Sequence, residues 1–157
     1  MLPVAEIAAA RHPLRLTGVA AGVVPWLMAD LARAGALDGR RAVLIAADEA
    51  AARAVVEAAP FFAPEVSPIW LPAWDCLPYD RASPAQKVLA DRLAALARLS
   101  RPPAGAELLV TTVAAATQRL LPPDMVRAST LEVREGSRIG RDELVGAHRV
   151  QFDRDEV

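Results

Sequence analysis

Three short runs of apolar residues, separated by stretches with helical periodicity, constrain the fold of this chain more than any other feature. They cover residues 41–47, 66–71 and 107–111. A continuous apolar run bounded by polar residues, such as the first one, is typical of a strand that is buried on both faces. Strands that alternate with helices predict parallel β–α units with right-handed crossovers. The sequence therefore predicts an α/β fold, in which a twisted parallel sheet carries helices on both faces.

The stretches before and after the first strand carry signals for the start and end of a helix. An apolar face with spacing i, i+3, i+4 and i+7 is formed by Val24, Leu27, Met28 and Leu31. Pro25 suits the first turn of this helix, and Gly35 suits its C-terminal end. Asp48 can cap the next helix, which Pro60 should end at about residue 59.

A third helix should begin at the capping box Ser83-Pro84-Ala85-Gln86, with proline at the first helical position. Its buried side should carry Val88, Leu89, Leu93, Leu96 and Leu99. A fourth, short helix should span residues 113–120. With these two helices, the expected alternation of strands and helices is complete.

After Pro122-Pro123 the regular alternation of apolar runs and helical periodicity stops. Residues 126–133 could form a strand, residues 136–140 a turn, and residues 141–147 one or two helical turns. This part has too little apolar content for a core of its own. We therefore expect an α/β subdomain over residues 1–121, and a smaller appended element over residues 122–157.

Composition excludes several classes of protein. The net charge is −1 and the 18 basic residues are dispersed, whereas an autonomous nucleic-acid binder needs a basic face. No apolar run approaches the length of a membrane span, and the N-terminus does not resemble a signal peptide. A single cysteine allows no internal disulfide. The sequence therefore favours a cytoplasmic protein without a membrane partner.

The stretch from Leu71 to Pro84 is the most distinctive part of the chain, because it holds Trp74, the only cysteine and the only tyrosine. Large aromatic side chains contribute much burial energy, and the prolines restrict the backbone. A loop with a fixed shape after a strand is a common place for function.

The segment from Thr17 to Val24 has the layout of a phosphate-binding loop, G-x-x-x-x-G-K-[ST]. Gly18 lies inside it, Gly22 matches the second glycine, and Thr17 replaces the first. Val23 and Val24 replace the lysine and the hydroxyl that bind phosphate and Mg²⁺. A plain glycine-containing turn is the alternative interpretation. Both interpretations predict no ATP hydrolysis at this segment and no bound cofactor.

The other candidate catalytic groups have simpler explanations. Asp48 and Glu49 look like the carboxylates of a helicase-type ATPase, but acidic residues at a helix start satisfy free N–H groups. Asp75 and Asp80 could pair as catalytic carboxylates, although Asx turns explain them better. Cys76 should be a small buried hydrophobe without a base beside it. We predict no catalytic residue.

No metal site is expected either, because His12 and His148 are isolated from other ligands.

The combination of these segments resembles the bacterial transcription-repair coupling factors, the Mfd family. The family pattern W-(D/E)-x-L-P-Y-(D/E), followed by Ser-Pro, matches Trp74, Asp75, Leu77, Pro78, Tyr79, Asp80, Ser83 and Pro84. Residues 44–48 and 110–119 resemble two further strands of the family, the second with its helix. The resemblance runs over about residues 14–145.

This resemblance implies a RecA/helicase-like fold over residues 1–121, similar to domain 1a of the excision-repair protein UvrB, with a degenerate nucleotide site. It implies that residues 122–157 are the start or a remnant of the family's UvrA-binding subdomain and its return strand. It implies a non-catalytic module that recruits UvrA to a stalled RNA polymerase. ATP, Mg²⁺, double-stranded DNA and the polymerase would be bound by other parts of the parent protein. The residues that contact UvrA stay unassigned, since the family's UvrA-binding strands are not visible before Val157. Residues 149–157 faintly resemble the strand by which the family's chain returns from that subdomain.

Two alternatives stay open. The first is a small α/β enzyme with a noncanonical nucleotide or small-molecule site near Asp48, Asp75 and Asp80. The second is direct DNA binding, which the near-neutral charge disfavours.

Overall fold

A computed structural model describes residues 4–76, 83–131, 136, 138 and 140–142. The chain divides into two compact units, Met1–Arg119 and Leu120–Val157, and each is described by itself. The expected boundary after residue 121 lies close to this division. The assignment of the second unit to a UvrA-binding subdomain stays a prediction.

The first unit is built on a three-stranded parallel sheet. Its strands are β1 (Ala42–Ala46), β2 (Ser67–Leu71) and β3 (Glu107–Thr112), in the order β1-β3-β2. The register pairs Leu44 with Val110 and Ile69 with Leu109, so β3 forms the centre of the sheet. The α/β class and the parallel sheet predicted from the sequence are confirmed.

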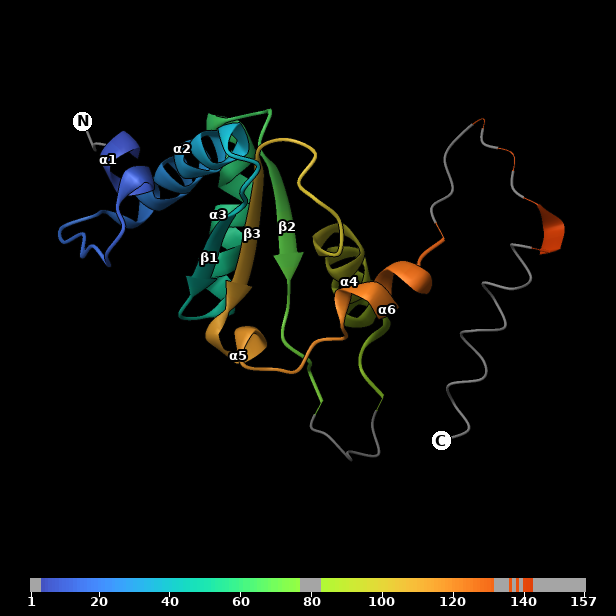
Figure 1. Ribbon diagram of the computed structural model, residues 1–157. Coiled ribbons are helices and arrows are strands. Elements are labelled where there is room, and N and C mark those ends of the chain that lie inside the picture. The colour runs from blue at the N-terminus through green and yellow to red at the C-terminus, as the bar shows by residue number, and fades with distance from the viewer. Residues whose placement is uncertain (1–3, 77–82, 132–135, 137, 139, 143–157) are drawn as a thin grey trace. The chain divides into compact units, whose positions relative to one another are not determined.

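Helices cover the sheet on both faces (Figure 1). On one face α2 (Val24–Leu37) and α3 (Glu49–Phe62) pack side by side, and α1 (Val4–Ala9) contacts α2. On the other face α4 (Gln86–Leu99) packs against β2. A one-turn 3-10 helix, η1 (Ala21–Val23), leads into α2, and the short α5 (Val113–Ala116) follows β3 directly.

Two cores lie on the two faces. The larger one, between the sheet and helices α2 and α3, includes Met28, Ala32, Val55, Leu108 and Val110. The smaller one, beneath α4, consists of Ile69, Leu71 and Ala95, with Leu99 and Leu109 packed against them. Successive residues of each strand point to opposite faces, so Leu108 and Leu109 serve different cores.

The expectation that residues 41–47 form a strand buried on both faces is wrong. β1 is an edge strand, and Val43 and Ile45 are 53% and 54% exposed. Helix α4 lies over β2 and leaves the same face of β1 uncovered among the described residues. The strand is apolar on both sides, but only the side of Ala42, Leu44 and Ala46 packs against helices.

The C-terminal end of α2 also differs from the prediction. The helix continues past Gly35 to Leu37, and Gly39 adopts the left-handed conformation, with φ of 64°. The N–H groups of Gly39 and Arg40 donate to the carbonyls of Ala36 and Gly35, at 3.1 and 2.8 Å. This is the Schellman arrangement. A Cβ atom on Gly35 would lie 3.0 Å from the Arg40 oxygen, so Gly35 permits a close approach of the chain.

Helix α3 begins as predicted and ends later than predicted. The Asp48 carboxylate accepts a hydrogen bond of 2.8 Å from the Ala51 N–H, which confirms the cap. Pro60 lies inside the last turn instead of ending the helix, which continues to Phe62. The bond from Ala63 N–H to the Ala59 carbonyl closes that turn.

The capping box predicted at Ser83 is not formed. Helix α4 starts at Gln86, its N-cap residue is Ala85, and no side chain of this residue caps it. The predicted buried side of α4 is also shifted, because Leu89 and Leu93 are exposed whereas Arg92 and Ala95 are buried. The hydrophobic periodicity indicated the helix but not the face that packs on the sheet.

The second unit contains α6 (Pro123–Ala128). The strand expected over residues 126–133 is therefore wrong for its first residues, which are helical. Pro123 suits the first turn of this helix, since proline there loses no helical hydrogen bond. Gly136 has φ of 79°, as a turn requires. Residues 143–147 of the expected last helix, and the faint return strand over residues 149–157, lie outside the described residues.

Candidate functional site

The loop that follows β2 is the candidate functional site, because it carries the most distinctive residues at the carboxyl end of a parallel strand. Of the signature residues, the structure describes Trp74, Asp75, Ser83 and Pro84. Leu77, Pro78, Tyr79 and Asp80 lie outside the described residues. The predicted role of this loop as an anchored, non-catalytic segment stays a prediction.

The first part of the loop is fixed by hydrogen bonds from two neighbouring segments. The Thr111 hydroxyl donates to the Leu71 carbonyl at 2.8 Å, and both residues are buried. The Gln118 side-chain oxygen accepts a bond of 3.1 Å from the Trp74 N–H. These contacts hold the chain beside the end of β3 and the segment after α5.

Arg92 of α4 lies beneath the loop. Its Nη1 donates to the Pro72 carbonyl and, at 3.0 Å, to Gln118 Oε1. Its guanidinium carbon lies 4.4 Å from the centre of the Trp74 ring, in a cation–π contact. Arg92 is 1% exposed, and this burial lowers the pKa of its guanidinium. The sequence pattern did not indicate a buried arginine, because a charged residue directly after Asp91 is typical of the solvated side of an amphipathic helix.

Asp75 and Asp48 bind backbone N–H groups. Both carboxylate oxygens of Asp75 accept from the Ala85 N–H, at 3.3 and 3.1 Å, immediately before α4. Asp48 is the N-cap residue of α3, and its carboxylate accepts from the Ala51 N–H. The cap predicted for Asp48 is formed, whereas Asp75 binds an N–H group ten residues away and not the local one of an Asx turn. That neither acid is catalytic stays a prediction. The third acid of the enzyme hypothesis, Asp80, is not among the described residues.

The segment from Thr17 to Val24 is not preceded by a strand in the part of the chain that the structure describes. Gly18 has φ of 71°, Gly22 opens no left-handed turn, and residues 21–23 form η1. A phosphate-binding loop normally connects a strand to the helix. The geometry agrees with the plain glycine-containing turn, and the lack of nucleotide binding stays a prediction.

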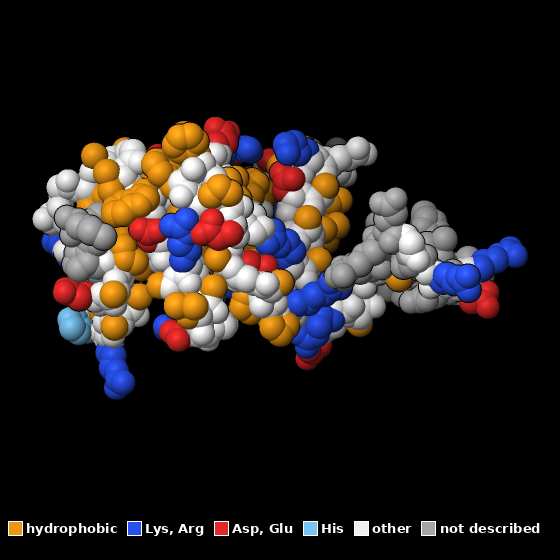
Figure 2. All heavy atoms as spheres, turned by 90° about the horizontal axis from the view of Figure 1, so that it is seen from above, with side chains coloured by type: hydrophobic (Ala, Val, Ile, Leu, Met, Phe, Trp, Pro, Cys, Tyr) orange, Lys and Arg blue, Asp and Glu red, His pale blue; other side chains and the backbone are white. Residues whose placement is uncertain are grey.

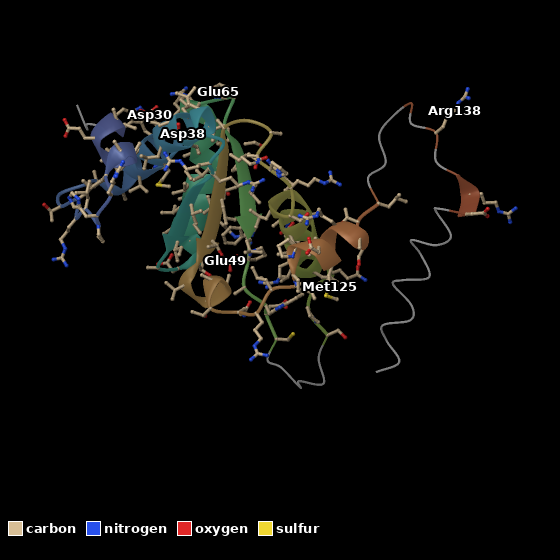
Figure 3. The ribbon with its side chains drawn as sticks, in the orientation of Figure 1. Asp30, Asp38, Glu49, Glu65, Met125 and Arg138 are labelled. Atoms are coloured by element: carbon tan, nitrogen blue, oxygen red, sulfur yellow. The ribbon has the colours of Figure 1, made fainter. Side chains whose placement is uncertain are left out.

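The charged side chains are mixed in sign. Figure 2 looks onto the amino-terminal ends of the strands, and over the first unit blue and red side chains alternate with apolar ones. Asp38 and Glu65 lie at this end of the sheet, whereas Glu49 lies at the other end (Figure 3). Arg33 bonds to both Asp30 and Glu65. This distribution offers no basic face on the surface in view.

A second cluster of charges ties the amino-terminal ends of β1 and β3 together. Arg41 Nε donates to Glu107 Oε2 at 2.5 Å, and Arg98 Nη2 donates to Glu107 Oε1 at 3.1 Å. Burial raises the pKa of Glu107, but the hydrogen bonds and charges of the two arginines outweigh it, so the net pKa lies below the ordinary value of 4.5. The cluster joins the starts of β1 and β3 to Arg98 of α4, away from the loop after β2.

His, Cys, Asp and Glu side chains do not gather in a group of three or more that could hold a metal ion within the described ranges. None of the helices in those ranges is long and apolar enough to span a membrane. Cys76 is a free, half-buried thiol.

Comparison with known proteins finds two similar sequences, and both are bacterial transcription-repair-coupling factors. The transcription-repair-coupling factor of Haemophilus influenzae is 36% identical over 73 residues, and that of Escherichia coli is 34% identical over 80 residues. The matches cover 46% and 51% of this chain, and 6% of each relative. No family model and no solved structure matches the chain. Over about half of its length, this chain is thus related in sequence to the transcription-repair-coupling factors.

Proposed function

We propose that this chain is a non-catalytic interaction module in transcription-coupled DNA repair, and that it recruits UvrA. The sequence match to two transcription-repair-coupling factors carries this proposal. The match covers a small part of those proteins, so the activity of a whole coupling factor is not transferred to the chain.

The residues at the glycine-containing segment support the non-catalytic part of the proposal. Val23 and Val24 cannot neutralise phosphate charge or bind Mg²⁺, whereas a working ATPase needs a lysine and a hydroxyl there. Asp48 and Asp75 are both occupied by backbone N–H groups. Motor activity, RNA polymerase and double-stranded DNA would belong to other parts of a coupling factor.

Two titration calorimetry experiments on the purified chain test the two parts separately. With ATP and Mg²⁺, we expect no binding heat, and micromolar binding or any hydrolysis would refute the non-catalytic part. With UvrA from the same organism, we expect saturable binding. The absence of UvrA binding at a concentration of about 50 μM, some fifty times a micromolar Kd, would refute the recruitment part.

A salt series separates the proposal from direct DNA binding. A DNA complex held by phosphate contacts loses affinity steeply as salt rises. We expect no measurable binding of duplex DNA even at low salt, because basic and acidic residues are nearly equal in number. Salt-sensitive binding of duplex DNA by the chain would favour the DNA-binding alternative.

A further inference from the structure

Large apolar side chains are exposed where α2 and α3 end, at the amino-terminal end of the sheet. Phe61 and Phe62 belong to the last turn of α3 and are 84% and 39% exposed. Leu37, the last residue of α2, is 89% exposed. Single exposed apolar residues are common on protein surfaces, whereas a group of them marks a contact site. We call Leu37, Phe61 and Phe62 the helix-end patch.

The contacts of Arg33 hold the two helix ends together. Arg33 Nη2 donates to the Phe62 carbonyl at 3.4 Å, and its Nε donates to the Glu65 carboxylate. Leu37 follows Arg33 by one helical turn, so it lies on the same side of α2 as this arginine. The Phe61 and Phe62 rings meet edge to face, with 5.4 Å between their centroids. The patch is therefore arranged before a partner arrives, which lowers the entropy cost of binding.

The rim of the helix-end patch is acidic. Its arginines are Arg33 and Arg40, and its carboxylates are those of Asp30, Asp38, Glu57 and Glu65. Figure 3 shows Asp30, Asp38 and Glu65 at the same end of the first unit. Glu57 is exposed and precedes Phe61 by one turn of α3. The C-terminal ends of both helices add partial negative charge, so this surface favours a positively charged partner.

We propose that the helix-end patch docks a protein segment in which apolar side chains alternate with lysine or arginine. The apolar side chains of the segment would cover Leu37 and Phe61, and a cation would also bind over an exposed phenyl ring. The rim carboxylates would attract the basic side chains, and they would repel nucleic acid and anionic lipid. The proposal does not depend on the proposed repair function.

Other occupants match the patch less well in charge. Residues 143–157 carry four acidic residues and two arginines, and residues 77–82 carry one residue of each sign. A second copy of the chain in a symmetric dimer would bring the same acidic rim against this one. A basic segment of another protein is therefore the occupant that the charges favour.

An NMR titration of the full chain with the peptide acetyl-Lys-Leu-Trp-Lys-Leu-Lys-amide tests the proposal. The matched control peptide has glutamate in place of each lysine. We expect the lysine peptide to shift the amide signals of Leu37, Phe61 and Phe62 in a saturable way. Because only a few apolar side chains are covered, the Kd should be about 0.1–1 mM. The glutamate peptide should cause no saturable shift at these amides.

Two variants separate the apolar contribution from the charged one, and both change exposed side chains. Phe61→Ala should weaken binding of the lysine peptide by about fivefold or more, because an aromatic anchor is lost. Glu57→Lys should weaken it by about threefold, as expected for a surface charge, and this difference should shrink at about 1 M salt. Leu93→Ala is the matched control, since Leu93 is 48% exposed on α4, and it should leave the Kd unchanged.

Four results would overturn the proposal. The first is the absence of a saturable shift up to about 5 mM lysine peptide, several times the expected Kd. The second is equal binding of the glutamate peptide. The third is an unchanged Kd in both Phe61→Ala and Glu57→Lys, or an equal loss in Leu93→Ala. The fourth is binding of phosphatidylcholine–phosphatidylserine vesicles at the same amides, since the patch would then bind lipid.

Discussion

Replacement of Glu107 by glutamine would measure how much the charge cluster at the start of β3 stabilises the fold. Glutamine keeps the size of the side chain and one acceptor oxygen, but it removes the negative charge between Arg41 and Arg98. The Glu107 and Arg41 side chains are only 8% and 16% exposed, whereas Arg98 is 40% exposed. Most of the effect should therefore come from Arg41, which would be left partly buried without its carboxylate.

The magnitude follows from these exposures. Removal of one member of a fully buried ion pair costs about 3–5 kcal/mol. Arg41 retains two carbonyl acceptors, those of Arg98 and Arg101, and the introduced glutamine could still accept one bond. The Arg98 contact is close to a surface pair, which contributes about 0.2–1 kcal/mol. We expect Glu107→Gln to lower the free energy of unfolding by about 2 kcal/mol, by combining these ranges.

Urea denaturation followed by far-UV circular dichroism would measure this difference. Asp91→Asn is the control, since it removes an i,i+4 contact with Lys87, whose side chain is 75% exposed. The control should cost less than about 0.5 kcal/mol. An equal loss in Glu107→Gln and Asp91→Asn would show that burial does not strengthen the Glu107 cluster.

The pH dependence gives a second check on the same variant. The folded pKa of Glu107 lies below 4.5, so the native state binds this proton less tightly than the unfolded state does. The stabilisation is then fully present above the unfolded pKa, and it is lost as pH falls through the folded pKa. The difference between wild type and Glu107→Gln should therefore be constant near neutral pH and shrink below 4.5. A difference that stays constant throughout acid titration would refute the reasoning.

Three further changes test local features of the fold by the same urea assay. Gly39→Ala should cost about 1–2 kcal/mol, because alanine is strained at positive φ, whereas Gly105→Ala, with open space around its Cβ, should cost little; equal costs would contradict the assigned helix end. Asp48→Ala should cost about 1 kcal/mol through the loss of the α3 cap, and Asp48→Asn should restore most of it; no loss in the alanine variant would contradict the cap. Leu108→Ala should cost about 2–5 kcal/mol, because this side chain is fully buried in the central strand, and a smaller loss would mean that the core collapses into the cavity.

The sequence predicted the features that depend on neighbouring residues. The alternation of apolar runs and helical periodicity predicted the α/β class, and Asp48 is recognisable as a cap because its partner N–H lies three residues away. Helix ends were less predictable. Asp75 supplies the contact at the start of α4 from ten residues earlier, and such a contact leaves no local pattern to compete with the apparent capping box at Ser83.

Features that depend on strand order and on packing across the sheet could not be predicted. The run 41–47 has the composition of a central strand, but the order β1-β3-β2 puts it at an edge. Arg92 and Leu93 differ by one helical position, or about 100° around the axis, and the sequence pattern favoured the leucine for the buried side. The role of Gln118 likewise depends on segments that are far apart in the chain.

The two edges of the sheet differ in their resistance to aggregation. β2 contains Pro68, which cannot donate a backbone hydrogen bond and so weakens any added strand. β1 contains no proline and exposes Val43 and Ile45, and no strand of the described ranges pairs with its outer edge. An edge with these properties is a template for intermolecular β-pairing. We therefore expect intermolecular pairing through β1 to limit the solubility of the protein. Ile45→Lys should raise that solubility, because a charged side chain on an edge strand opposes such pairing.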